Sequence, residues 1–170
     1  MRLRQGGPAD LPAVLALFDG TVAWLAARGR SGQWGDRPWS GDPDRVRLVT
    51  GLVAEGLWVA EAAGEESGGA PAGVITLTEE APAYAPPAGE RELYVRLLLV
   101  SRDCTGRNVG GKLLAFARRQ ARERGIGLVR VDCWSGGDGA LIRYYEGQGF
   151  APTVRVPVGE KEVQVLQLRI

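Results

Sequence analysis

Histidine is absent from this chain of 170 residues. The sequence therefore cannot pair a serine or cysteine nucleophile with an imidazole base, and it lacks the histidine ligands of many metal sites. Cysteine is nearly absent as well, since only Cys104 and Cys133 occur, far apart and without the paired spacing of zinc or redox motifs. We expect two free thiols and no bound metal.

Excess charge of either sign and long apolar runs are also missing. The 21 basic and 20 acidic side chains give a net charge of +1, so no overall field favours nucleic acid or a membrane surface. No apolar run approaches the roughly 20 residues that span a bilayer, and no long apolar stretch follows the first arginines. We expect a cytoplasmic protein without a signal peptide, folded as a single domain over residues 1–170.

Hydrophobic periodicity predicts helices and strands in alternation along the chain. The helical segments are 8–29, 43–56, 110–124 and 138–149, and the strand segments are 2–4, 57–62, 72–80, 92–100, 127–134, 151–158 and 162–170. The strand, helix and strand over Glu92–Trp134 form a βαβ unit, which pairs its strands in parallel. A turn over 63–71 and the last two strands predict antiparallel hairpins. The expected fold class is α/β, a mixed sheet with helices on both faces, whose open edges would allow a homodimer.

The segment "GRNVGG", residues 106–111, separates an apolar strand from a basic amphipathic helix. The first amides of a helix have no intrahelical partner and carry the positive end of its dipole, so they attract anions. Gly110 and Gly111 would let an anion approach the backbone, and Arg107 and Lys112 would add charge. The segment lacks the lysine–serine pair of a P-loop and the acidic residue of a dinucleotide fingerprint. Alone, it is equally typical of an ordinary turn between strand and helix.

Two motifs give this segment a context. Arg107-x-x-Gly110-x-Lys112, followed by two leucines, resembles the Gln/Arg-x-x-Gly-x-Gly/Ala signature of the GCN5-related N-acetyltransferase (GNAT) superfamily, with lysine in place of the last small residue. Downstream, "DGALIRYYEGQGF" resembles the second motif of that family, Asn-x-x-Ala-x-x-x-Tyr-x-x-x-Gly-Phe. Tyr145 takes the tyrosine position and Asp138 the position of the asparagine. With "LYVRLLLV", "DCW" and "YYE", the chain is most similar to small actinobacterial members.

The resemblance implies the GNAT fold and an enzyme that transfers the acetyl group of acetyl-CoA to the primary amine of a small-molecule acceptor. The amine would attack the thioester directly in a ternary complex. The pantetheine would lie along Leu98, Leu99 and Val100, where a backbone N–H would act as the oxyanion donor. The residues implied in binding the rest of acetyl-CoA are Arg107, Asn108, Val109, Gly110, Gly111, Lys112, Asp138 and Tyr145.

The resemblance also suggests catalytic roles, each with a structural alternative. Tyr145 is the candidate general acid for the CoA thiolate, and the alternative is a core tyrosine with its hydroxyl at the surface. Glu92 is the candidate general base, and Asp132 lies on the neighbouring strand. Either carboxylate could instead be solvated or ion-paired. An amine that binds with a lowered pKa would need no dedicated base.

Four residues are candidates for the wall of the acceptor pocket: Trp34, Trp39, Asp132 and Trp134. Aromatic faces beside carboxylates suit a cationic amine. The alternative is that the tryptophans anchor the long loop after the first helix to the core. Two other functions stay open on the sequence alone. One is a non-catalytic module that binds or senses acyl-CoA on the same fold, and the other is a nucleotide-binding module that uses the glycine turn.

Overall fold

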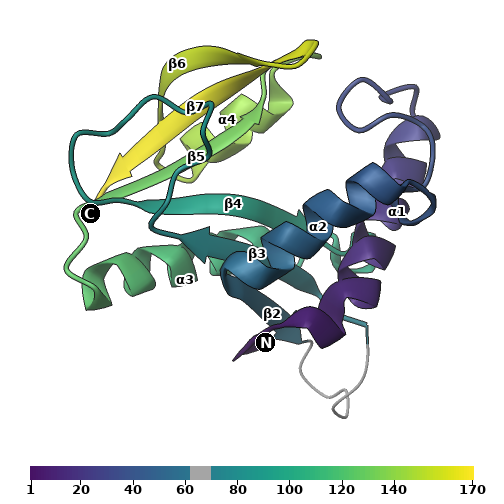
Figure 1. The fold of residues 1–170 in the computed structure, drawn as a ribbon, viewed down its shortest axis with the longest axis horizontal. Coiled ribbons are helices and arrows are strands. Elements are labelled where there is room, and N and C mark those ends of the chain that lie inside the picture. Colours follow the sequence, from purple (N-terminus) through teal and green to yellow (C-terminus); the bar gives the residue numbers. More distant parts are fainter. Residues whose placement is uncertain (62–69) are drawn as a thin grey trace. The chain divides into compact units, whose positions relative to one another are not determined.

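The computed structural model describes residues 1–61 and 70–170 (Figure 1). Its strands are β1 (Arg2–Gln5), β2 (Leu57–Glu61), β3 (Gly73–Thr78), β4 (Leu93–Val100), β5 (Leu128–Trp134), β6 (Ala151–Val158) and β7 (Lys161–Arg169). Its helices are α1 (Leu11–Ala26), α2 (Pro43–Gly56), α3 (Val109–Glu123) and α4 (Ala140–Gly147), with short 3₁₀ turns η1 (Pro8–Asp10), η2 (Trp39–Gly41) and η3 (Arg102–Cys104). The predicted turn over 63–71 falls mostly on residues 62–69, outside the described residues.

The strands are hydrogen-bonded in the order β1-β2-β3-β4-β5-β7-β6. β4 and β5 run parallel, as the βαβ pattern predicts, and pair Leu93–Val95 with Val129–Val131. The pairs β1–β2, β2–β3, β5–β7 and β6–β7 are antiparallel. The predicted fold class, a mixed α/β sheet, is confirmed, since a parallel pair joined by a helical crossover lies among antiparallel hairpins.

The chain forms two compact units. Unit 1 contains Met1–Leu77 and Leu97–Leu113, and unit 2 contains Thr78–Arg96 and Leu114–Ile170. β4 and α3 each contribute to both units, so the carboxyl half of β4 and the first turn of α3 belong to unit 1. The single domain over the whole chain stays a prediction.

The core of unit 1 is formed by α1, α2 and apolar residues of β2, β3 and β4 (Figure 1). Val14, Phe18 and Val22 recur at helical spacing on α1 and are buried in this core. The segment Pro8–Ala26 is long and apolar enough to be a candidate membrane span, with a mean hydropathy of 1.4. A core helix of a globular protein has the same length and apolar composition, and residues of α1 belong to the core cluster of unit 1.

The core of unit 2 is formed by α3, β5 and β7. Leu114, Ala117 and Ala121 recur on one face of α3 and are buried, while basic side chains occupy the exposed face. The next helix, α4, begins at Ala140 rather than at the predicted Asp138. Asp138 stays outside the helix because its carboxylate accepts a hydrogen bond from the Ala140 N–H at 3.0 Å.

Candidate active site

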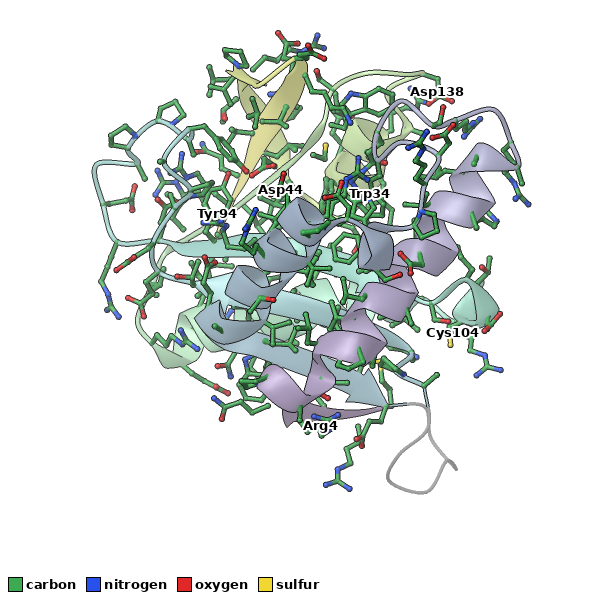
Figure 2. The ribbon with its side chains drawn as sticks, turned by 45° about the vertical axis from the view of Figure 1, so that its right-hand side comes forward. Arg4, Trp34, Asp44, Tyr94, Cys104 and Asp138 are labelled. Carbon is green, nitrogen blue, oxygen red and sulfur yellow. The ribbon has the colours of Figure 1, made fainter. Side chains whose placement is uncertain are left out.

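The connection between β4 and α3, residues 101–108, lies in unit 1 and contains Cys104 (Figure 2). Gly106 has a φ of +82° and Asn108 a φ of +52°, and Asn108 is the only non-glycine residue with positive φ in the described parts of the chain. Asparagine tolerates this region because its short amide side chain can hydrogen-bond locally. Positive φ at neighbouring residues is typical of backbone loops that form a concave anion site. Within this loop, the Arg107 N–H between the two residues donates to the Cys104 carbonyl at 3.2 Å. The unpaired amides at the start of α3 follow directly, so an anion could bind here.

The backbone favours a different register for the glycine signature. Gly110 and Gly111 already belong to α3, since the N–H of Lys112 donates to the Asn108 carbonyl at 3.1 Å. Positive φ, which favours glycine, occurs in this loop at Gly106 and Asn108 and not at Gly110 or Gly111. Aligned on Asn108, the signature runs from Thr105 to Gly110, and Gly110 becomes its last small residue. Lys112 then falls outside the signature, and its side chain is exposed.

A close approach of β3 fixes the carboxyl end of β4 within unit 1. The Ser101 N–H donates to the Ala72 carbonyl at 2.9 Å. A Cβ on Gly73 would stand 2.8 Å from the Leu99 carbonyl oxygen, so only glycine lets the two backbones come this near. Leu99 is buried, and the residues on either side of it are half-buried. The predicted pantetheine strand therefore has a fixed backbone, and its buried side chain belongs to the core.

The two tryptophans of the long loop, also in unit 1, differ in their surroundings. Trp39 is buried, stacks on Phe18 with ring centroids 4.3 Å apart, and donates from Nε1 to the Trp34 carbonyl at 3.1 Å. Its backbone N–H donates to the Asp19 carboxylate at 2.6 Å. Trp39 thus anchors the loop to the core, which is the alternative to a role in the wall of the acceptor pocket. Trp34, labelled in Figure 2, is half-buried and also packs against this core, with its ring centroid 5.3 Å from that of Phe18. Its place in the pocket wall stays a prediction.

In unit 2, Glu92 has a structural partner. Both of its carboxylate oxygens accept hydrogen bonds from the Arg130 guanidinium, and the side chains are only 7% and 6% exposed. Arg130 also donates to the Pro86 carbonyl at 2.9 Å, which ties the connection before β4 to β5. The guanidinium thus occupies both carboxylate oxygens through charge-assisted hydrogen bonds. Glu92 therefore matches the ion-paired alternative better than the role of general base.

Asp132, by contrast, accepts hydrogen bonds from two neutral donors among the residues that the structure describes. Its Oδ2 accepts from the Tyr94 hydroxyl at 2.8 Å and from the Tyr84 hydroxyl at 3.1 Å. Tyr94, labelled in Figure 2, pairs with Arg130 in the β4–β5 register, which places Tyr94 and Asp132 on the same face of neighbouring strands. Burial raises the pKa of Asp132, while the two phenols and the charge of Arg96 act to lower it. This balance is typical of a carboxyl group tuned for proton transfer.

Tyr145 is buried on α4, with Tyr144 and Phe150 edge-on to its ring at centroid distances of 5.3 and 5.9 Å. Burial raises the pKa of Tyr145, so its phenol stays protonated at neutral pH, as a general acid requires. The nearby Cys133 is buried too, which raises the pKa of its thiol to about 12. Because the thiolate is the reactive form, Cys133 is not suited to carry an acyl group.

The remaining predicted residues of unit 2 lie at the carboxyl end of β5 and just after it. Trp134 is half-buried, and its indole packs against the backbone of Gly136. Asp138 (Figure 2) is exposed, and one of its carboxylate oxygens accepts a hydrogen bond from the Ala140 N–H, while Gly139 is the N-cap of α4. Among the described residues, no group of three or more cysteine, aspartate or glutamate side chains could hold a metal ion.

The structure distributes the predicted residues over both units. Leu98–Val100, Arg107–Lys112 and the two loop tryptophans belong to unit 1, whereas Glu92, Asp132, Trp134, Asp138 and Tyr145 belong to unit 2. Sequence reasoning missed Tyr84, Tyr94 and Arg130. Their signal was weak: an aromatic residue in a proline-rich connection, and two polar side chains two residues from carboxylates on predicted parallel strands.

Comparison with known proteins identifies the fold. Residues 26–150, more than half of the chain, match the model of the family described as the acetyltransferase (GNAT) family. No match was found among curated proteins. A GNAT-family acetyltransferase from Listeria monocytogenes superposes with a TM-score of 0.70 at 19% identity, over 99% of this chain and 94% of that one.

Two further solved structures show the same fold. The structure of yncA from Salmonella typhimurium with its cofactor acetyl-CoA gives a TM-score of 0.62 at 21% identity, over 99% of this chain and 93% of that one. A ribosomal-protein-alanine N-acetyltransferase from Brucella melitensis gives 0.62 at 20% identity, over the full length of both chains. At such identities the likeness establishes the fold alone. The actinobacterial subgroup and the cytoplasmic location stay predictions.

Proposed function

The chain belongs to the acetyltransferase (GNAT) family, and from this premise we propose that it transfers the acetyl group of acetyl-CoA to the primary amine of a small molecule. The observation that carries the proposal is the backbone of residues 106–111. Left-handed Gly106 and Asn108 precede the unpaired amides of α3, which together suit the pyrophosphate of CoA.

Acetyl-CoA fits the residues next to this loop as well. The parallel register of β4 with β5 covers Leu93–Val95, and Leu98–Val100 follow it toward the loop. An extended pantetheine arm could hydrogen-bond to that backbone as an added strand does. A backbone N–H in the same stretch would stabilise the negative charge that develops on the thioester oxygen. These positions are proposals supported by the strand geometry and by the family.

Direct transfer in a ternary complex agrees with the state of the thiols. A covalent acyl-cysteine needs a thiolate, and burial keeps Cys133 protonated. In the direct reaction, the lone pair of the neutral amine forms the C–N bond and the C–S bond of the thioester breaks. The Tyr145 phenol gives its proton to the departing CoA thiolate, and a proton from the attacking nitrogen restores the phenol. CoA thiol and the amide are the products.

Ligand binding and catalysis can be tested separately. We expect CoA to raise the melting temperature of the protein, because a ligand that binds the native state stabilises it. Thiol release from acetyl-CoA is then followed over a panel of primary amines. Stabilisation by ATP and not by CoA would replace the proposal with a nucleotide-binding module. Stabilisation by CoA with no thiol release for any amine would leave an acyl-CoA sensor.

A matched pair of glycine variants tests the loop itself. A Cβ on Gly111 would collide with the carboxamide of Asn108, whereas nothing lies within 4 Å of a Cβ on Gly127. Gly111→Ala should weaken CoA binding in calorimetry, because displacement of Asn108 disturbs the anion concavity. Gly127→Ala is the control and should bind CoA as the wild type does. Equal affinities in the two variants would count against this loop as the CoA seat.

A further inference from the structure

We propose that the Asp132 carboxylate accepts the proton that the ammonium form of the acceptor must lose, and that Tyr84 and Tyr94 are the positioning residues that hold it ready. The inference rests on the proposed acetyl transfer and deepens it. It is based on three side chains that meet from separate segments of unit 2: Asp132 of β5, Tyr94 of β4 and Tyr84 of the connection before β4.

One oxygen of Asp132 is left for a substrate. Both phenols donate to Oδ2, at 2.8 and 3.1 Å, so they fix the plane of the carboxylate without occupying Oδ1. In the described part of the chain, no hydrogen bond to Oδ1 is found. Burial raises the pKa of both Tyr84 and Tyr94, so they remain hydrogen-bond donors at neutral pH. The carboxylate is thus oriented by neutral groups and can receive a cation.

Charge distinguishes Asp132 from the other candidate base. The negative charge of Glu92 is balanced by Arg130 in a buried ion pair. Asp132 accepts hydrogen bonds from two phenols instead, and the charge of Arg96 acts to lower its pKa. A buried carboxylate with dipolar partners attracts an ammonium group and prefers to become neutral by taking its proton. Glu92 would have to break an ion pair to do the same.

The positioning of Tyr84 depends on the ion pair. Tyr84 lies in the proline-rich connection, and Arg130 anchors that connection through the Pro86 carbonyl at 2.9 Å. Glu92 holds the Arg130 guanidinium in place by accepting from two of its nitrogens. The Arg130 guanidinium also lies over the Tyr94 ring, with its carbon 5.4 Å from the centroid. Glu92 and Arg130 therefore support both phenols that orient Asp132.

The proton balance of the step is simple. R–NH₃⁺ gives one proton to Asp132, which becomes a neutral carboxylic acid, and the amine lone pair is freed for attack on the thioester carbon. After transfer, Asp132 releases that proton to water. The second nitrogen proton ends on the CoA thiol through Tyr145, as described above. One proton thus reaches solvent for each ammonium group acetylated, and no other reactant is needed.

The test compares Asp132→Asn with the wild type in a pH–rate profile, using the best amine of the panel. Loss of a general base lowers turnover by roughly 10²–10⁴-fold, so we expect kcat at pH 7 to fall by at least about 100-fold with CoA affinity unchanged. The acidic limb of the profile should shift to the pKa of the free amine. A fluorinated analogue of the same amine, neutral at pH 7, should restore most of the lost rate. The exposed Glu123→Gln is the carboxylate-to-amide control and should keep wild-type rates.

Tyr84→Phe keeps the test decisive if Asp132→Asn fails to fold. Because a hydrogen bond to an ionised carboxylate favours the ionised form, its loss should move the acidic limb upward by about one pH unit. A purely structural tyrosine would leave the limb in place. An unshifted limb in both variants, or wild-type kcat in Asp132→Asn, would overturn the assignment. Failure of the proposed function looks different, since the wild type itself would then release no thiol with any amine.

Discussion

Replacement of Glu92 by glutamine separates a structural carboxylate from a catalytic one. The Glu92→Gln side chain has nearly the same shape, but it removes the negative charge that faces the Arg130 guanidinium. Both partners are buried, with 7% and 6% of their side chains exposed. In the part of the chain that the structure describes, the substitution therefore leaves the buried Arg130 guanidinium without a charge partner within hydrogen-bond distance. One acceptor oxygen also becomes an N–H₂ donor that faces the guanidinium.

The expected cost is large for a single conservative change. Removal of one partner from a buried ion pair typically costs about 3–5 kcal/mol, because the remaining charge stays desolvated. In a chain of this size, 1 kcal/mol lowers the melting temperature by roughly 2–4 °C. We therefore expect Glu92→Gln to lower the melting temperature by on the order of 10 °C. Urea unfolding followed by fluorescence of the tryptophans would measure the free energy directly.

A double variant and a rate measurement complete the test. Since a buried ion pair can often be replaced by apolar side chains at little cost, Glu92→Leu combined with Arg130→Met should recover part of the stability that Glu92→Gln loses. At a temperature where Glu92→Gln is folded, kcat should fall by less than about tenfold, well below the loss of a general base. A variant that keeps the wild-type melting temperature and loses about 100-fold or more in kcat would refute this reasoning and make Glu92 the base.

Three further outcomes follow from the structure. Gly73→Ala should destabilise the protein by about 1–3 kcal/mol, because its new Cβ clashes with the Leu99 carbonyl. Gly51→Ala lies at an open helical position of α2 and should stabilise the protein by up to about 1 kcal/mol. Urea unfolding measures both free energies, and a lower free energy of unfolding in both variants would contradict this expectation. Because the pKa of Asp132 is raised, the ionised group costs stability at neutral pH, so Asp132→Asn should raise the melting temperature at pH 7, and the gain should shrink as the pH falls through the raised pKa. Scanning calorimetry at several pH values measures this difference in melting temperature. A difference that does not change with pH would contradict a cause in the raised pKa of Asp132. Tyr145→Phe should lower kcat by roughly 10²-fold or more while CoA binds as before in calorimetry; wild-type turnover would remove Tyr145 from the mechanism.

The order of helices and strands was predictable because burial leaves a period in the sequence. Segments such as 92–100 and 110–124 carry strand and helix patterns strong enough to place β4 and α3, and the parallel pairing followed from the crossover between them. The exact starts of helices were less accessible. α3 begins at Val109 because Asn108 adopts a left-handed conformation, and no periodicity reports that choice.

The candidate site was only partly predictable, because its chemistry depends on strand register. The sequence offers Glu92 and Asp132 as carboxylates on neighbouring strands, but it does not say which one meets Arg130. The structure pairs Tyr94 with Arg130, and the guanidinium reaches Glu92. Tyr84 was out of reach for a different reason, since it lies in an aperiodic proline-rich segment that Arg130 contacts at the Pro86 carbonyl.

The two carboxylates show how one register can assign opposite roles to similar groups. Glu92 lies just before β4 and Asp132 lies on β5. Arg130 of β5 contacts Glu92, and Tyr94 of β4 donates to Asp132. The Arg130 guanidinium pairs with Glu92 and balances its charge. The phenols donate to Asp132, so they orient its carboxylate and leave its charge in place. Environments that separate two carboxyl groups in this way are how proteins set proton acceptors apart from structural charges. The parallel register of β4 and β5 places Arg130 where its guanidinium meets Glu92, and it places Asp132 where its carboxylate meets the Tyr94 hydroxyl, so this register determines which carboxylate is left without a cation as its hydrogen-bond donor.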